Sequence, residues 1–306
     1  MEIPHAHTHM ISLDSAALRD WPLPMPAAAG DKEQRGHVLV LGGSRDMPGA
    51  VILAATAALR AGAGKLTIAT GASVAQLVAL AMPEARVIGL RETPEGGFTV
   101  DAMDTLAPLA ERIGAILIGP GMQDEAASAA LVRALLPALA GTAVVLDANA
   151  MGIVRNPDLD GAAAPFRFAE PVVLTPHAGE LAHLGGAAKQ AIGADPVAHA
   201  ARAAHAWQAV VALKGARTII AAPDGAMWQH EGGNVGLAVS GSGDVLAGII
   251  AGLAARGATL VQAACWGVAL HARAGERLAE RMGLLGYLAR ELPHEVPLLL
   301  EQAARG

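Results

Sequence analysis

From residue 37 onward, short aliphatic runs alternate with longer alanine-rich runs, and this alternation constrains the fold more than any other feature. A short run at 37–41 is followed by an alanine-rich run at 50–62 and a second short run at 65–70. Such alternation is typical of parallel strands joined by crossover helices. The short runs are almost continuously apolar, as a sheet buried on both faces requires. We therefore predict an α/β fold whose central, mostly parallel sheet is covered by helices on both faces.

Later segments extend and then close the predicted sheet. Further strands are expected at 115–121, 143–150, 171–177 and 209–215. After Lys214, two extended runs flank the turn Pro223-Asp224-Gly225, which predicts an antiparallel hairpin followed by three helical stretches. Neither a linker nor a repeat of solenoid period is found. We expect one domain at 32–306, preceded by an N-terminal arm and leading segment at 1–31.

Composition excludes several classes of protein. The 306 residues can bury a sizeable core, and a net charge of -6 offers no basic field for nucleic acid. The N-terminus lacks the basic start of a signal peptide, and the apolar run at 245–255 is far too short to span a membrane. The only cysteine, Cys265, excludes a disulfide framework within one chain. We expect a soluble, cytoplasmic protein without nucleic-acid or membrane partners.

Five of the predicted strands end in residues that turn the chain or carry chemistry. These strand ends are Gly42-Gly43-Ser44, Gly119-Pro120-Gly121, Asp147-Ala148-Asn149, Thr175-Pro176-His177 and Lys214-Gly215-Ala216. Ligands of an open parallel sheet bind outside the carboxyl ends of the strands. Turn chemistry alone would explain one or two of these tripeptides, but three add a charged or imidazole side chain. The sequence therefore predicts an active site at this edge.

Three residues at these strand ends each allow more than one interpretation. Lys214 could bind a phosphate, with Gly215 and Thr218 offering an N–H and a hydroxyl, or it could be a surface lysine. His177 could donate to a substrate amide or hydroxyl, or be an ordinary loop residue. Asp147 could orient water, bind magnesium indirectly or cap the next segment, and spacing does not separate these roles.

The stretch LAVSGSGDVLAG at 237–248 places small residues before an apolar helix. Its apolar positions are not confined to one stripe, so the helix should be buried on most sides. Gly241, Ser242 and Gly243 could leave backbone N–H groups free for an anion, with Asp244 facing the chemistry. Alternatively, Asp244 only stabilises the helix N-terminus, by about 1 kcal/mol. From this stretch alone both interpretations stay open.

Three alternating histidines, His5, His7 and His9, lie near the N-terminus. They could bind a metal ion, or they could belong to a mobile terminal arm without a site.

Six motifs, in this order along the chain, resemble those of the ADP-dependent NAD(P)H-hydrate dehydratases, a branch of the ribokinase-like superfamily. They are GHVLVLGGSRDMPGAVILAATAALRAGAGKLTIAT, ILIGPGM, VVLDANAM, VVLTPHAGELAHL, ALKGARTIIAAPDG and GNVGLAVSGSGDVLAGIIAGLAARG. The resemblance runs from about Lys32 to the end of the chain. It implies a ribokinase-like three-layer α/β/α fold with a C-terminal antiparallel hairpin. Since only some 30 residues precede the first motif, we expect the dehydratase domain alone, without a fused epimerase.

The resemblance also implies a reaction and the residues that carry it. The S epimer of hydrated NADH or NADPH would be dehydrated to NADH or NADPH while ADP is converted to AMP and phosphate. Asp244 would be the base, and the N–H groups of Gly241, Ser242 and Gly243 the anion hole. The nucleotide would contact Lys214, Gly215, Ala216, Arg217, Thr218 and Gly243. The hydrated dinucleotide would contact Ala50, Gly121, His177 and Asp244.

Further expectations follow from the same resemblance. We expect ADP as co-substrate together with Mg²⁺, a functional link to a separate NAD(P)H-hydrate epimerase, and a homo-oligomer, as a homotetramer. Asp147 and Asn149 are possible supporting residues. Asn149 stands where the family often has Asp or Gly, which weakens its assignment as a metal ligand, so no metal ligands are named.

Two other functions remain as alternatives. A ribokinase-like kinase would phosphorylate a vitamin or sugar hydroxyl, and it shares the Gly-x-Gly-Asp turn. The paired segments GGSRDMPGA and LTPHAGE favour the dehydratase. A nucleotide-binding regulatory protein without turnover would not need a carboxylate such as Asp244 facing a phosphate.

Overall fold

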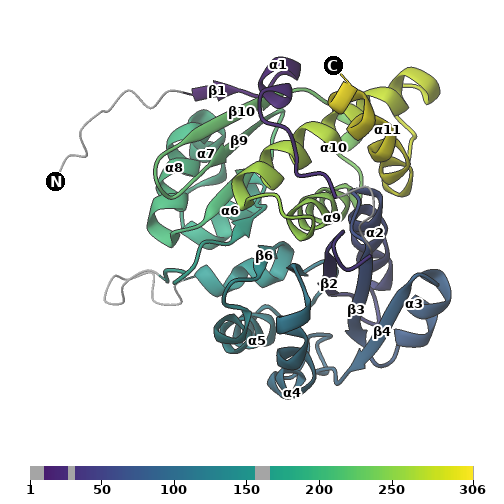
Figure 1. Ribbon diagram of the computed structural model, residues 1–306. Coiled ribbons are helices and arrows are strands. Elements are labelled where there is room, and N and C mark those ends of the chain that lie inside the picture. Colours follow the sequence, from purple (N-terminus) through teal and green to yellow (C-terminus); the bar gives the residue numbers. More distant parts are fainter. Residues whose placement is uncertain (1–9, 27–31, 156–165, 306) are drawn as a thin grey trace.

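A ten-stranded sheet forms the centre of the molecule (Figure 1). The computed structural model describes residues 10–26, 32–155 and 166–305, so His5, His7 and His9 lie outside the described residues. The strand order is β1-β10-β9-β8-β7-β6-β5-β2-β3-β4. The strands are β1 (Met10–Ser12), β2 (His37–Leu41), β3 (Lys65–Gly71), β4 (Ala85–Leu90), β5 (Ala115–Ile118), β6 (Ala143–Leu146), β7 (Val173–Leu174), β8 (Val210–Leu213), β9 (Arg217–Ala221) and β10 (Met227–Glu231).

Strand direction divides the sheet into a parallel and an antiparallel part. Seven strands that are adjacent in the sheet, in the order β4-β3-β2-β5-β6-β7-β8, run parallel to one another. Strand β9 is antiparallel to both β8 and β10. The predicted mostly parallel sheet and the C-terminal hairpin are thus confirmed. From β2 the chain builds outward through β3 to β4, and from β5 it builds the other way to β8. The carboxyl ends of β2 and β5 therefore form a topological switch point, where open α/β sheets bind ligands.

Helices cover both faces of the sheet, as the continuous apolar strands predict. Val38 and Val40 of β2 belong to one core cluster, and Leu39 and Leu41 belong to the other. One face packs against α2 (Pro48–Arg60), α3 (Ala75–Ala81), α9 (Ser242–Ala255), α10 (Leu260–Met282) and α11 (Leu292–Arg305). The other packs against α4 (Met103–Leu106), α5 (Glu125–Leu135), α6 (Ala178–Gly185), α7 (Lys189–Ala194) and α8 (Pro196–Trp207).

Helix α9 is the most deeply buried of these helices. Every residue from Val245 to Ala255 is buried, which confirms the prediction made from its apolar sequence. Two glycines let it approach α2: a Cβ on Gly248 would overlap the carbonyl oxygen of Ala54, and one on Gly252 that of Ala58. This close packing fixes the position of the turn at the N-terminus of α9, directly beside the sheet edge.

The leading segment contributes an edge strand that the sequence pattern did not predict. Strand β1 pairs in parallel with β10, Met10 opposite Met227, and α1 (Ser15–Arg19) follows it. His230 Nδ1 donates a hydrogen bond to the carbonyl oxygen of Leu13 at 2.8 Å. Three residues with two exposed positions show no readable periodicity. The domain boundary at residue 31 stays a prediction.

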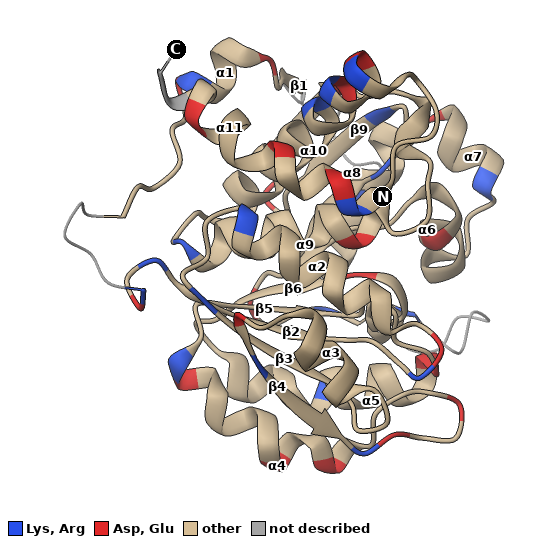
Figure 2. Ribbon diagram, turned by 90° about the vertical axis from the view of Figure 1, so that its right-hand side faces the viewer, with Lys and Arg blue, Asp and Glu red and all other residues tan. Residues whose placement is uncertain are grey.

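Charge is spread rather than segregated over the molecule. In Figure 2, Lys and Arg positions are interspersed with Asp and Glu positions on the outer helices and loops. Within the described ranges, none of the helices combines the length and hydropathy needed to cross a membrane.

Candidate active site

The turn before α9 holds backbone N–H groups open at the sheet edge. Gly241 adopts a left-handed φ of 89°, and a Cβ there would lie 2.5 Å from Leu53 Cδ1, so this position requires glycine. No side chain caps the helix. The Ser242 N–H donates to the Val239 carbonyl at 3.2 Å, whereas those of Gly243 and Asp244 have no acceptor within the described part of the chain. The turn can therefore bind an anion through these N–H groups.

An ammonium group lies between two carboxylates next to this turn. Lys214 Nζ is 3.5 Å from Asp147 Oδ1 and 3.6 Å from Glu180 Oε2. Burial lowers the pKa of Lys214, but Asp147 and Glu180 outweigh that effect and raise it above its usual value. A Cβ on Gly243 would be 3.4 Å from Nζ, so the charged amine faces the helix N-terminus. The cluster thus presents a fixed positive charge beside the free N–H groups.

Asp147 is buried and is held in place by Thr175. It is 3% exposed, and its Oδ1 accepts a hydrogen bond of 2.6 Å from the Thr175 hydroxyl. The next residue, Ala148, has a φ of 47°, an unusual conformation for a residue with a side chain. Strained backbone of this kind is concentrated at functional sites.

Asp244 has a strongly raised pKa. Desolvation raises its pKa to about 7, with a further contribution from the negative charge of Asp147 and a smaller one from Glu180, while Lys214 opposes the shift. A carboxyl group that titrates near neutral pH is suited to accept and release a proton during turnover. Of the two interpretations of Asp244, this environment favours chemistry over simple helix capping.

His177 marks the start of α6, on the other side of Lys214. Its Nδ1 accepts a hydrogen bond of 3.0 Å from the Glu180 N–H, and Glu180 Oε2 accepts one of 2.7 Å from the His177 N–H. Because Nδ1 is an acceptor, the neutral ring carries its proton on Nε2. The side chain is 58% exposed and Nε2 lies 3.7 Å from Glu180 Oε2, too far for a hydrogen bond, so Nε2–H can donate to a ligand.

Ala50 and Gly121 meet at the switch point between β2 and β5. Gly121 has a φ of 67°, and a Cβ on it would lie 2.6 Å from the Met47 carbonyl oxygen and 2.8 Å from Ala50 Cβ. The loop after β5 therefore packs directly on the start of α2. Asn149 lies close to this loop, where its Nδ2 donates to the Met122 carbonyl at 3.0 Å.

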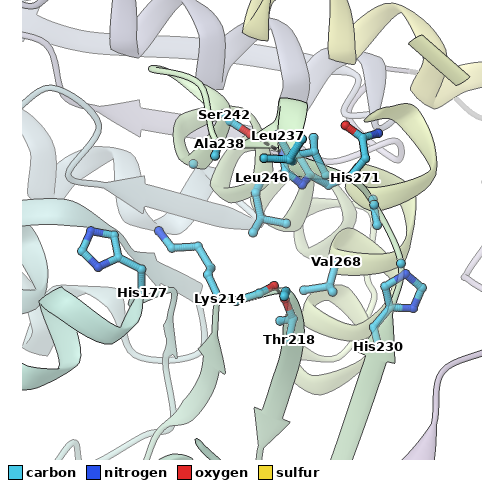
Figure 3. A pocket seen from close by; sticks show the side chains of 18 of the residues that line it. His177, Lys214, Thr218, His230, Leu237, Ala238, Ser242, Leu246, Val268 and His271 are labelled. Atoms are coloured by element: carbon cyan, nitrogen blue, oxygen red, sulfur yellow. Dashed lines mark hydrogen bonds between the residues drawn. The ribbon is translucent and has the colours of Figure 1, made fainter. Parts of the chain in front are cut away.

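A cavity of about 690 Å³ opens beside the turn (Figure 3). Figure 3 shows the Lys214 side chain extending toward His177, with Thr218 below it and His230 at the far end. The cavity unites six of the predicted site residues with His177: Lys214, Gly215, Ala216, Thr218, Ser242 and Gly243. Arg217 does not line it and lies 3.9 Å from Glu231 instead. Ala50, Gly121, Asp147, Asn149, Gly241 and Asp244 are also outside its lining.

The structure adds residues that the sequence did not single out. Glu180 links Lys214 to His177, and its signal was present as the third residue after His177, the spacing of a capping box. His271 of α10 lines the cavity and contacts Ser242, but nothing in the sequence connects two residues 29 positions apart. A second hollow of about 1060 Å³ lies near Arg60 and Arg256 and contains none of the predicted site residues.

Comparisons with known proteins show what the chain is similar to. The family model for NAD(P)H-hydrate dehydratase (Carb_kinase) matches residues 38–298. The chain is 51% identical to the ADP-dependent (S)-NAD(P)H-hydrate dehydratase of Xanthomonas campestris, over 96% of this chain and 98% of that protein.

Two solved structures share the fold. A ribokinase-like superfamily protein from Enterococcus faecalis superposes with a TM-score of 0.82 at 26% identity, covering 100% of both chains. The ADP/ATP-dependent NAD(P)H-hydrate dehydratase of Bacillus subtilis, co-crystallised with ATP and Mg²⁺, gives a TM-score of 0.79 at 30% identity, covering 96% of this chain and 99% of that one. The predicted ribokinase-like three-layer fold is therefore confirmed.

Proposed function

The chain belongs to the NAD(P)H-hydrate dehydratase family, and on that premise we propose that it repairs hydrated nicotinamide cofactors. The reaction is the ADP-dependent dehydration of the S epimer of hydrated NADH or NADPH, which yields NADH or NADPH, AMP and phosphate. One observation carries the proposal: a carboxylate with a pKa near 7, a fixed ammonium and free backbone N–H groups meet at the N-terminus of α9.

Each group in this cluster has a part in phosphoryl transfer. Asp244 takes the proton from the substrate hydroxyl, whose oxygen attacks the β-phosphorus of ADP as the bond to the AMP oxygen breaks. Lys214 and the free N–H groups of Gly243 and Asp244 stabilise the charge of the transferred group. Phosphate then leaves with the electrons of its bond to the ring carbon and accepts a proton from the adjacent carbon, whose C–H electrons form the ring double bond again.

The two substrates occupy opposite sides of the turn. The cavity takes the adenine nucleotide, which Lys214, Gly215, Ala216, Thr218 and Gly243 contact, while Arg217 approaches it from outside the lining. The hydrated dinucleotide lies toward the switch point, in contact with Ala50 and Gly121, and also contacts His177, which lines the cavity as well. Asp244 lies between them and faces the hydroxyl.

Magnesium fits this site only together with a nucleotide. Across residues 10–26, 32–155 and 166–305, no group of three or more His, Cys, Asp or Glu could hold a metal ion alone. Asp147 and Glu180 present carboxylate oxygens near Lys214 Nζ, and Mg²⁺ is commonly bound by one or two carboxylates plus substrate phosphates. We propose that Asp147 and Glu180 would hold Mg²⁺ together with a bound nucleotide, and that the ion would supply charge neutralisation for the phosphates. Asn149, bonded to Met122, supports the loop instead.

The proposal extends to assembly, location and partners. The name of the Xanthomonas relative specifies the S form of the hydrate, so a separate epimerase would be needed to convert the other epimer. We propose that the protein works as a homotetramer in the cytoplasm, where the nicotinamide cofactors turn over. Exposed apolar residues on α3, Leu77 and Leu80, support self-association.

A rescue assay tests the function. Purified protein is incubated with chemically hydrated NADPH, with ADP, with ATP or without nucleotide, and the absorbance of reduced nicotinamide is followed. We expect recovery that requires a nucleotide and that Asp244→Asn slows by about 100- to 10,000-fold, the contribution of a general base, while ADP binding persists. Recovery without nucleotide, or full activity of Asp244→Asn, would refute the mechanism. Phosphorylation of a sugar or vitamin alcohol, with no effect on the hydrate, would establish the kinase instead.

A further inference from the structure

Ser242 and His271 form a hydrogen-bonded pair in the wall of the nucleotide cavity. Ser242 Oγ lies 2.9 Å from His271 Nε2, and both residues line the cavity (Figure 3). Ser242 is the first residue of α9, yet its side chain does not cap the helix. Its hydroxyl is therefore directed to α10 and the cavity, next to Gly243 of the anion-binding turn.

The imidazole of His271 is neutral at the pH of the cell. Desolvation lowers the pKa of His271 to about 4, an effect partly opposed by a hydrogen bond to the Ser242 backbone and reinforced by the charge of Lys214. A neutral imidazole has one N–H and one lone pair. In the described chain, Ser242 contacts the ring twice, through its hydroxyl at Nε2 and through its backbone.

The position of the ring proton decides what Ser242 can offer to a ligand. If Nε2 is the acceptor, the hydroxyl proton points at His271 and only oxygen lone pairs face the cavity. If Nε2 carries the proton, it donates to Oγ. The hydroxyl proton can then point toward the anion-binding site at Gly243. A phosphoryl group bound at the turn is an acceptor only and repels lone pairs, so an anion there selects the second arrangement.

We propose that His271 is a positioning residue whose Nε2–H holds the Ser242 oxygen, so that the Ser242 hydroxyl donates a hydrogen bond to the phosphoryl group being transferred. This inference rests on the proposed function and adds a side-chain donor to the backbone N–H groups of the turn. The Ser242 N–H itself is occupied by the Val239 carbonyl, so the hydroxyl is the donor that this residue retains. His271 acts through Ser242 and touches no reacting atom.

A double-mutant cycle separates positioning from ordinary packing. Ser242→Ala removes the donor, and His271→Leu removes its support while filling the site with an apolar side chain. His271→Gln keeps an amide N–H at a similar distance from the backbone. Each variant and the Ser242→Ala/His271→Leu double variant is assayed for kcat and KM with ADP, and for Tm.

The expected result is a set of coupled losses. Loss of one oxyanion donor costs about 100- to 1,000-fold in kcat, so we expect Ser242→Ala near the lower value and His271→Leu at roughly 10- to 100-fold. KM for ADP changes less than kcat, because the bond matters most as charge develops on the phosphoryl group. The double variant is no slower than Ser242→Ala, and His271→Gln recovers most of the rate.

Other outcomes overturn the inference. Losses that multiply in the double variant, a His271→Leu variant as active as the wild type, or a loss that tracks Tm and is not relieved by Gln would each show that the pair only packs. Hydrate turnover by the wild type, measured in parallel, distinguishes failure of the proposed function from failure of the Ser242–His271 pairing. Without hydrate turnover by the wild type, the proposed function falls and this inference falls with it, whereas turnover with multiplicative losses refutes the pairing alone.

Discussion

At the scale of single residues, the role of Asp244 depends on groups that come from distant parts of the chain. The sequence shows a carboxylate at a helix start, which either caps the helix or performs chemistry. Its pKa of about 7 results from burial and from Asp147, which lies almost one hundred positions earlier. Folding brings these groups together, so spacing along the chain could not decide between the two interpretations.

The raised pKa of Asp244 predicts a pH-dependent cost in stability. The folded state binds this proton more tightly than the unfolded state, so the stabilisation is complete below the ordinary value of 3.8 and is lost as the pH rises through about 7. Asn has no charge to bury. We therefore expect Asp244→Asn to exceed the wild type in Tm by a smaller margin at pH 5 than at pH 8, while activity is lost at both.

A control makes this measurement specific. Asp104 is an exposed aspartate on α4, and Asp104→Asn should show no comparable difference between pH 5 and pH 8. If the Tm of Asp244→Asn falls below that of the wild type at pH 8, the carboxylate is stabilising and the physical account of its burial is wrong.

Lys214 gives a second residue-scale prediction. Replacing it with Met removes the only ammonium between Asp147 and Glu180 in the described chain and a charged donor for the nucleotide phosphates. Since a hydrogen bond to a charged group contributes about 1.5–3 kcal/mol, calorimetry should show ADP binding roughly 10- to 150-fold more weakly. Lys189→Met, at an exposed position of α7, should bind ADP like the wild type. Unchanged affinity in Lys214→Met would remove Lys214 from the nucleotide site.

At the scale of elements, the long periodic segments could be predicted and the short ones could not. The continuous apolar sequences of elements such as β2, β3 and α9 predict that these elements are buried. Glu180 and His271 were missed because each has a role only through a contact that folding makes, with Lys214 and with Ser242. Edge strand β1 has three residues and needs β10 to exist, so no local signal marks it.

The packing of α9 on α2 leads to a prediction about stability. Gly248→Ala would push a methyl group into the carbonyl oxygen of Ala54, and such overpacking typically costs about 1–3 kcal/mol. We expect a lower free energy of unfolding in urea, and slower turnover because the turn at the head of α9 moves with it. Gly193→Ala on α7, where nothing lies within 4 Å of the added methyl, should be neutral or slightly stabilising. Equal stability of Gly248→Ala and wild type would contradict the close approach of the helices.

At the scale of the whole molecule, the strand topology predicts which edge of the sheet carries the site. The five strand ends predict one ligand-binding edge. The parallel strands that are adjacent in the sheet, in the order β2-β5-β6-β7-β8, bring these ends to the same edge. What topology could not show was which of these residues share one cavity and which, such as Ala50 and Gly121, contact each other outside its lining. That division depends on how deeply α9 enters the molecule.

Self-association is the prediction that belongs to this scale. Leu77 and Leu80 are 62% and 81% exposed on one helix beside the free edge strand β4, and exposed edges favour pairing with another copy. Light scattering should give a mass four times the chain mass of 30.9 kDa, and Leu80→Glu should reduce it. Leu298→Glu, at an exposed position of α11, serves as the matched control. A monomeric wild type would exclude the tetramer.

Strand β1 has a consequence for the order in which the molecule can be assembled. Leu13 and its partner His230 are 217 positions apart, so the segment that contains β1 leaves the ribosome long before β10 exists. Contacts of such long range are formed late, because the loop between them must first be closed. The parallel strands can associate as they emerge, and the cavity wall at β10 can be completed only afterwards. A nascent chain can therefore form its switch point before the cavity wall at β10 exists, and β1 is synthesised early but can dock only after β10 has been made.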